Sequence, residues 1–169
     1  MGSEIEFGQG LILSEQKDGL IIDWHLFKDQ PPSDNKLLKP TLERIQHYYG
    51  KTEHSCTDRG FNNKSNDAFL KTNNIYNATC PRNPEQLQEK LKDPIFLKLQ
   101  TRRSQTEARI GIFKNVFLGK PLRSRVTEYK RTAISWGILT HNLWLLSRRA
   151  LDIEKVNQFN HSRRLKKAA

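Results

Sequence analysis

The chain has 169 residues, of which 36% are hydrophobic and 28% charged, as is typical of a globular protein large enough to bury a core. No apolar run approaches the roughly 18 residues of a membrane span, and residues 1–10 lack the apolar stretch of a signal peptide. We therefore expect a cytoplasmic protein without a membrane partner. Cys56 and Cys80 form no CxxC pair, so the sequence predicts neither a disulfide framework nor a zinc site.

The net charge of +11 is concentrated in the C-terminal part of the chain. Residues 1–100 hold 13 Lys and Arg against 14 Asp and Glu, a net charge of −1, whereas residues 101–169 hold 16 against 4, a net charge of +12. This concentration indicates a polyanionic partner, most often nucleic acid. The alternative is a solvated helix surface and a basic tail that bind nothing specific.

A β-hairpin is predicted near the start of the chain. An apolar stretch at 11–14 and a second at 20–27 flank Asp18-Gly19, a dipeptide typical of tight hairpin turns. In the second strand four side chains fall on one face by the two-residue period of strands; these are Leu20, Ile22, Trp24 and Leu26.

Helices and short strands alternate over the next part of the chain. Apolar residues at helical spacing predict a helix that includes Leu38, Leu42, Ile45 and Tyr49, with Gly50 at its C-terminal end. Pro40 either begins this helix or kinks a longer one that starts near Ser33. The following segments are then expected: a strand at 54–57, a helix at 65–71, a strand at 75–80 and a polar segment at 85–92, helical or an inserted loop.

The remainder of the chain is expected to be helical. One helix covers 101–118 and a longer one 126–149, and residues 151–169 form a basic tail that we expect to be disordered. The order of elements predicts a single mixed α/β or α+β domain over residues 1–150.

Asp58 and Glu107 are the candidate metal-binding residues. Asp58 follows a predicted strand, where carboxylates of α/β proteins meet ligands and can bind Mg²⁺; the alternative is a turn aspartate bonded to its own backbone. Glu107 shares a helix face with Arg103 and Lys114 at spacings of four and seven. The alternative there is an ordinary surface ion pair.

Other polar residues are weaker candidates for a catalytic or metal-binding role. His141 and Asn142 lie within an apolar helix, and we expect His141 to be a core residue. Asp23 and His25 lie on the opposite face of the second strand from its apolar side chains, without an evident third ligand. The sequence has no phosphate-binding glycine loop, nucleophile elbow or zinc pattern.

The segment 101–115, TRRSQTEARIGIFKN, resembles the last catalytic motif of bacterial insertion-sequence transposases of the DDE class. The branch that it resembles has Tyr, two residues, Arg, three residues, Glu, six residues and Lys. Arg103, Glu107 and Lys114 match this spacing, whereas Gln100 stands at the Tyr position. The segment 57–61, TDRGF, is similar to the second-Asp segment of the family, and the similarity covers most of residues 5–149.

The resemblance implies a ribonuclease-H-like fold, a mixed sheet with flanking helices. Its core is three antiparallel strands followed by helix, strand, helix, strand and helix, with the first catalytic Asp on the first strand. The hairpin corresponds to the second and third strands. Only Glu4 and Glu6 are acidic before it, so we expect the first strand and its Asp, and the family's N-terminal DNA-binding region, to be missing.

The family performs DNA transposition, a form of DNA recombination, by metal-dependent strand cleavage and transfer with two Mg²⁺ or Mn²⁺ ions. By the resemblance, Asp58 and Glu107 are catalytic metal ligands, and Arg103, Lys114 and Arg59 contact DNA. We expect a truncated transposase that is inactive without the bridging Asp. Its expected partners are transposon ends and target DNA in the bacterial nucleoid, and a full-length transposase or a second copy.

Two alternatives remain at this stage. The first is a non-catalytic DNA-binding protein that uses its basic C-terminal half. The second is a stand-alone metal nuclease that completes its site with another carboxylate, such as Asp23.

Overall fold

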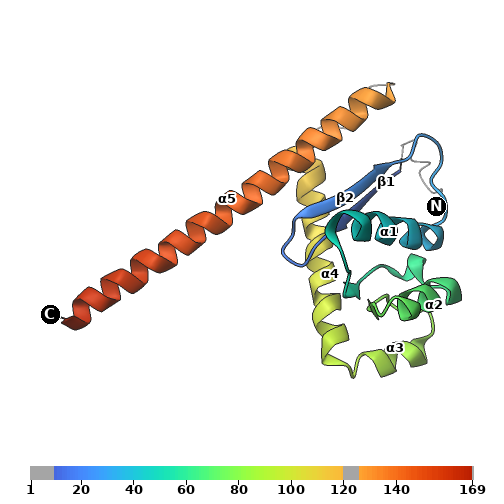
Figure 1. Ribbon diagram of the computed structural model, residues 1–169, viewed down its shortest axis with the longest axis horizontal. Coiled ribbons are helices and arrows are strands. Elements are labelled where there is room, and N and C mark those ends of the chain that lie inside the picture. Colours follow the sequence, from blue (N-terminus) through green and yellow to red (C-terminus); the bar gives the residue numbers. More distant parts are fainter. Residues whose placement is uncertain (1–9, 120–125, 169) are drawn as a thin grey trace, which may run out of the picture. The chain divides into compact units, whose positions relative to one another are not determined.

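The computed structural model describes residues 10–119 and 126–168, and the side chains as far as residue 158 (Figure 1). The described chain divides into two compact units. The first contains the described residues up to Lys17 together with Ile21–Ile110, and the second contains Asp18–Leu20 and the described residues from Gly111 onward. The division falls near residue 110, and the single domain expected over 1–150 stays a prediction. No helix in the described residues is long and apolar enough to span a membrane.

The predicted hairpin is confirmed in the first unit. Strand β1 (Leu11–Glu15) pairs with β2 (Ile21–Leu26) in antiparallel orientation, and Gly19 in the connection has a φ of +95°, which glycine adopts without strain. A bulge between Ser14 and Glu15 places Glu15 opposite Ile21.

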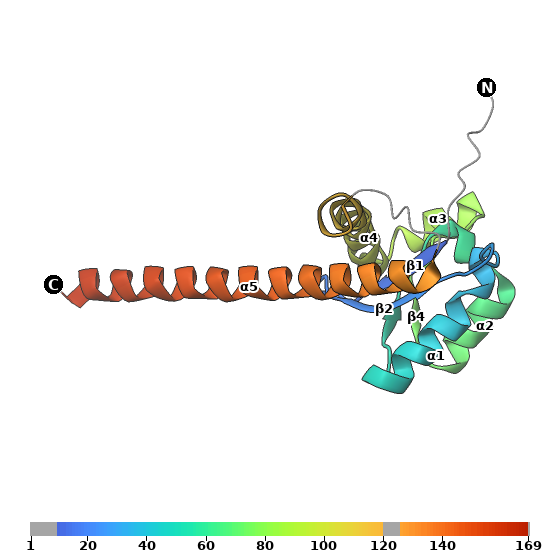
Figure 2. The same cartoon turned by 90° about the horizontal axis from the view of Figure 1, so that it is seen from above.

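The expected apolar face of β2 is only partly correct. Ile21 and Leu26 are its buried residues, and Ile22 and Trp24 are half-buried. Figure 2 shows the hairpin between α1 (Leu38–Tyr49) and α4 (Pro94–Ile112), so helices cover both of its faces. Burial in a strand covered on both sides does not alternate with a period of two.

Helix α1 forms where the apolar spacing predicted it. Leu38 and Leu42 are buried, and Pro40 lies within the first turn, where its missing N–H is not needed. Gly50 ends the helix at a φ of +81°, and its N–H donates to the Gln46 carbonyl at 3.0 Å. The short helix η1 (Asp34–Lys36) precedes α1 as a separate element.

The core of the first unit lies between α1 and α2 (Lys64–Thr72). Leu70 and Ile75 pack with the two buried leucines of α1, and Phe61 and Phe69 cover this cluster. Asn63 begins α2 by accepting the Asn66 N–H at 2.6 Å, as a helix N-cap does.

Strands β3 (His54–Ser55) and β4 (Tyr76–Asn77) pair in parallel, and η2 (Arg59–Phe61) follows β3. Both strands are shorter than predicted. In the described residues each sheet has two strands, β1 with β2 and β3 with β4. The expected mixture of helices and strands is confirmed at this coarse level.

The polar segment at 85–92 is a helix, α3 (Pro84–Lys90), with Asn83 as its N-cap. Helix α4 begins at Pro94 rather than near Thr101. Asp93 accounts for this early start because its side chain accepts the Ile95 N–H at 2.8 Å, and Phe96 in the first turn is fully buried.

The second unit pairs η3 (Phe113–Phe117), a π-helical turn, with α5 (Thr127–Ala168). A Cβ atom on Gly137 of α5 would lie only 3.0 Å from the Leu118 side chain, so glycine permits this close approach. The backbone of α5 continues to Ala168, which differs from the disordered tail expected over 151–169. Residues 151–168 contain neither Gly nor Pro, so nothing in this stretch interrupts a helix.

Candidate functional site

Asp58 lies just beyond β3, at the position expected from the sequence. It is exposed, and its side chain accepts the Arg59 N–H as the N-cap of η2. The backbone carbonyl of Arg59 accepts from Arg82 Nε at 3.4 Å, while the Arg59 side chain is exposed. Asp58 therefore already makes the turn contact that was the alternative interpretation, although its exposed carboxylate can still reach a ligand.

Glu107 lies on α4 and forms an ion pair with Arg103 one turn earlier. Its side chain is 60% exposed, and that of Arg103 is 29% exposed. Arg103 also donates from Nε to Gln100 Oε1 at 3.1 Å, so its guanidinium is held from both sides. An exposed pair of this kind contributes little to stability.

Gln100, which stands at the Tyr position of the resembled motif, attaches α4 to the parallel strands. Its Nε2 donates to the Ala78 carbonyl just after β4 at 2.6 Å, and it lies 3.8 Å from Cys56 Sγ. The Cys56 thiol donates to the Leu99 carbonyl at 3.4 Å. These contacts place Leu99 and Gln100 of α4 against the segment that leads from β3 to Asp58.

Cys56 lies close to the same arginine as Glu107. Burial raises the pKa of its thiol to about 11, and the nearby Arg103 guanidinium opposes part of this shift. The structure thus brings Arg103 and the residues before Asp58 together in one region, a juxtaposition that spacing in the sequence did not predict.

Lys114 lies in η3, within the second unit, and is exposed. The expectation that it shares a face with Glu107 assumed one regular α-helix over 101–118. The helix is instead π-helical from Phe113, where residues no longer recur at 3.6 per turn. Glu107 belongs to the first unit and Lys114 to the second, so a shared face of these two residues stays a prediction.

Glu15 is an acidic residue that sequence reasoning missed. Only 7% of its side chain is exposed, and its carboxylate accepts hydrogen bonds from Arg102 at 2.6 Å and from Arg109 at 2.7 Å. Arg102 and Arg109 are seven residues apart and so project on one side of α4. Glu15 is therefore used to join the hairpin to α4, and the seven-residue spacing of the two arginines was the signal available in the sequence.

Asp23 is not placed to complete a metal site with Glu107. Arg44 of α1 binds both of its carboxylate oxygens, at 2.7 and 3.1 Å. The partner of Asp23 thus belongs to α1, whereas Glu107 belongs to α4. This geometry removes the support for a nuclease site completed by Asp23.

The described residues fit a two-metal site poorly. Asp58 and Glu107 offer the oxygen ligands that Mg²⁺ prefers. No group of three or more His, Cys, Asp or Glu in the described part of the chain could hold a metal ion. The described residues therefore provide an incomplete set of ligands for a two-metal site.

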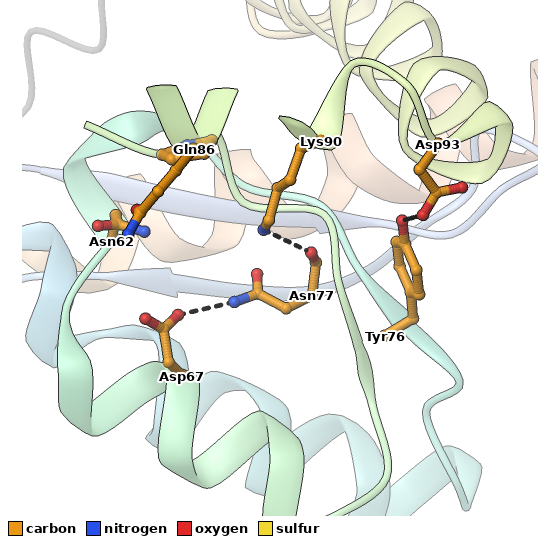
Figure 3. A pocket seen from close by; sticks show the side chains of 8 residues that line it. Asn62, Asp67, Tyr76, Asn77, Gln86, Lys90 and Asp93 are labelled. Carbon is orange, nitrogen blue, oxygen red and sulfur yellow. Dashed lines mark hydrogen bonds between the residues drawn. The ribbon is translucent and has the colours of Figure 1, made fainter. Parts of the chain in front are cut away.

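A polar hollow of about 420 Å³ lies elsewhere in the first unit (Figure 3). It is lined by Asn62, Asp67, Tyr76, Asn77, Pro81, Gln86, Lys90 and Asp93. Lys90 Nζ donates to the Asn77 carbonyl at 3.0 Å, and Asn77 Nδ2 donates to Asp67 at 2.7 Å. The Tyr76 hydroxyl donates to the Asp93 carboxylate.

These contacts shift the acid–base properties of the hollow. Burial, together with the Asp93 carboxylate, raises the pKa of Tyr76 to about 12, and the hydrogen bond from Tyr76 lowers the pKa of Asp93. Burial lowers the pKa of Lys90. The bonds among Lys90, Asn77 and Asp67 form a hydrogen-bonded joint between α3, β4 and α2 along one part of the hollow.

His141 is a core residue, as expected. It is 2% exposed, and its ring packs edge-on against Phe113 and Phe117 at centroid distances of 6.1 and 5.2 Å. Its Nδ1 lies 3.1 Å from Asn142 Oδ1.

Comparison with protein-family models, with curated proteins and with solved structures found no match.

Proposed function

We propose that this chain is part of the catalytic domain of a DDE-type insertion-sequence transposase, without strand-transfer activity of its own. The observation that carries the proposal is the contact of Gln100 with Ala78 and Cys56. Through it, Gln100 and the turn of α4 that leads to Arg103 lie beside Ala78, which follows β4, and Cys56, which precedes Asp58. The motif spacing and the exposed carboxylates support the same function.

The arrangement of the described strands supports a ribonuclease-H-like domain that has one strand fewer among the described residues. Helix α4 contacts the hairpin through Glu15 and the parallel pair through Gln100, so both two-stranded sheets share one covering helix. One further strand, paired antiparallel with one strand of the hairpin and parallel with β3, would join the two pairs into a single mixed sheet. The resemblance implies a first strand in this role, and the bridging Asp would lie on it.

We predict that the chain binds Mn²⁺ weakly through Asp58 and Glu107 and does not transfer DNA strands. Mn²⁺ binding should broaden the backbone amide NMR signals of both residues because the ion is paramagnetic. Glu107→Gln should reduce the broadening at both positions, since it removes one of two anionic ligands. Strand transfer is measured with short duplex DNA in Mg²⁺ or Mn²⁺.

Glu89→Gln is the matched control, because Glu89 is an exposed glutamate on α3 and its loss changes the net charge equally. It should leave the broadening unchanged. Equal effects of the two variants would refute a metal site at Glu107. Robust Mg²⁺-dependent strand transfer that Glu107→Gln abolishes would refute the proposed inactivity.

A non-catalytic DNA-binding protein is the second candidate function, favoured by the net charge of +12 over residues 101–169. Such a protein is indifferent to Mn²⁺. DNA binding without metal-induced broadening at Asp58 would select it over the transposase.

A further inference from the structure

An exposed apolar stripe runs along α5 and is not used by the packing within the second unit. Its members are Trp136, Leu139, Leu143, Leu146, Ala150 and Ile153, all of them exposed. Trp136, Leu143 and Ile153 are 64%, 55% and 63% exposed. Single exposed apolar side chains are normal on a protein surface, whereas a contiguous apolar patch marks an interaction site.

The stripe lies on the other side of α5 from the residues that pack against η3, because a regular helix turns by about 100° per residue. That packed side has Ile134, Ile138 and His141, which are 1%, 8% and 2% exposed. Phe113 and Phe117 of η3 form ring contacts with His141. The helix therefore has one side that is buried within its own unit and a second apolar stripe that no described residue of that unit covers.

The spacing of the stripe is that of a coiled coil. Its members follow one another at steps of three, four, three, four and three residues, which places them alternately at the a and d positions of a seven-residue repeat. A helix that packs on a globular core shows a wider stripe with a period near 3.6. A strict repeat of seven over nearly three heptads instead indicates pairing with another helix of the same period.

The sequence beside the stripe favours a second copy of this chain as that helix. The flanking e and g positions from 135 to 147 are Ser135, Thr140, Asn142 and Ser147, all uncharged. Two copies therefore meet without like charges along this length, although the chain as a whole is strongly basic.

A parallel arrangement is favoured by the residues farther along the helix. In a parallel pair, Arg149 at a g position of one copy lies near Glu154 at the following e position of the other, and their charges are opposite. Arg149 also bonds Asp18 at 2.9 Å, so the carboxylate of Glu154 would add to an existing ion pair. Asn157 occupies the next a position, where a pair of Asn side chains favours a parallel dimer in register.

We propose that α5 dimerises this chain through a parallel two-stranded coiled coil formed by the 136–153 stripe. This inference rests on exposure and heptad spacing and does not depend on the proposed function. The test is the molar mass of the full chain by size-exclusion chromatography with light scattering, over a series of micromolar concentrations. The wild-type chain should have twice its monomer mass of 19.7 kDa.

Leu143→Glu should reduce the mass to that of a monomer because it places a charge at the centre of the stripe. Leu151→Glu is the matched control, since Leu151 is equally exposed on the same helix but lies off the stripe. It should remain dimeric. Circular dichroism should show both variants folded, and a double variant, Leu139→Ser with Leu146→Ser, repeats the test without added charge.

A wild-type mass of 19.7 kDa at every concentration would overturn the proposal. A dimer equally sensitive to Leu151→Glu and Leu143→Glu would overturn it too. The orientation is tested with Asn157→Cys under mild oxidation. A disulfide between the two introduced cysteines, identified by mass spectrometry, is expected for the parallel register, and its absence from a dimeric sample would overturn that register.

Discussion

Cys56 is a partly buried thiol beside Arg103 of the candidate site. Its thiol donates to the Leu99 carbonyl of α4, and burial keeps its pKa near 11 despite the adjacent Arg103 guanidinium. Only the thiolate reacts as a nucleophile. Cys56 is therefore a structural thiol rather than a reactive one at neutral pH.

We predict that alkylation of Cys56 by iodoacetamide is slow in the folded protein. Because burial raises the folded pKa of Cys56 from the ordinary 9.0 to about 11, its alkylation rate should continue to rise with pH toward about 11, whereas the rate in the unfolded chain should level off above pH 9. The same shift means that stability contributed by the neutral thiol is lost as pH rises from 9 toward 11. The rate is measured by mass spectrometry in a Cys80→Ser variant, with the urea-unfolded protein as control. Identical pH profiles in both states would contradict a buried thiol.

At the scale of elements, the joint between β1 and α4 is an ion cluster rather than an apolar contact. Arg102 and Arg109 both bind the carboxylate of Glu15, and the Thr106 hydroxyl adds a bond at 3.3 Å. The two guanidiniums are 22% and 25% exposed, so water reaches part of the cluster. The same ion cluster attaches α4, the helix that contains Glu107, to β1.

We predict that Glu15→Ala lowers the free energy of unfolding by about 3 kcal/mol, because it leaves two partly buried arginines without their anion. Arg109→Ala should cost less, since Arg102 still neutralises Glu15. The control is Glu89→Ala on the exposed face of α3, which should change stability by at most about 0.5 kcal/mol. Urea denaturation measures all three, and a loss for Glu15→Ala no larger than that for Glu89→Ala would show that the cluster is not stabilising.

For the whole molecule, the sharp division of charge is the property that bears most on function. The first 100 residues are nearly neutral, and the remaining 69 hold a net charge of +12. Counterion release makes the affinity of such a surface for DNA depend steeply on salt.

We predict that the chain binds duplex DNA and that log K falls linearly with log salt concentration. Lys114→Glu should weaken binding to all sequences alike and reduce the salt slope by about 1 if Lys114 contacts a phosphate. Lys71→Glu in the nearly neutral part is the control, because Lys71 is also an exposed lysine. Fluorescence anisotropy measures both, and equal losses would mean that net charge alone, rather than the basic C-terminal part, determines binding.

The amino-acid sequence by itself determined the local elements of this protein. The hairpin at Gly19, the helix that ends at Gly50 and the core position of His141 follow from turn chemistry and hydrophobic spacing, which act over a few residues. The two site carboxylates were also located to a strand end and a helix from sequence patterns alone. Metal binding at Asp58 and Glu107 remains a prediction.

The tertiary structure decided which of these elements meet. Gln100 donates a hydrogen bond to the Ala78 carbonyl, and the Glu15 carboxylate binds two arginines of α4. The Asp23 carboxylate is bound by Arg44. These are contacts between residues at least 21 positions apart, and no short-range spacing encodes them. The change to a π-helical turn at Phe113 is likewise a departure from the regular helix that periodicity assumes. The long-range contact with Arg44 therefore argues against Asp23 as a member of the candidate site. Asp58 and Glu107 are candidates that local sequence patterns already indicate.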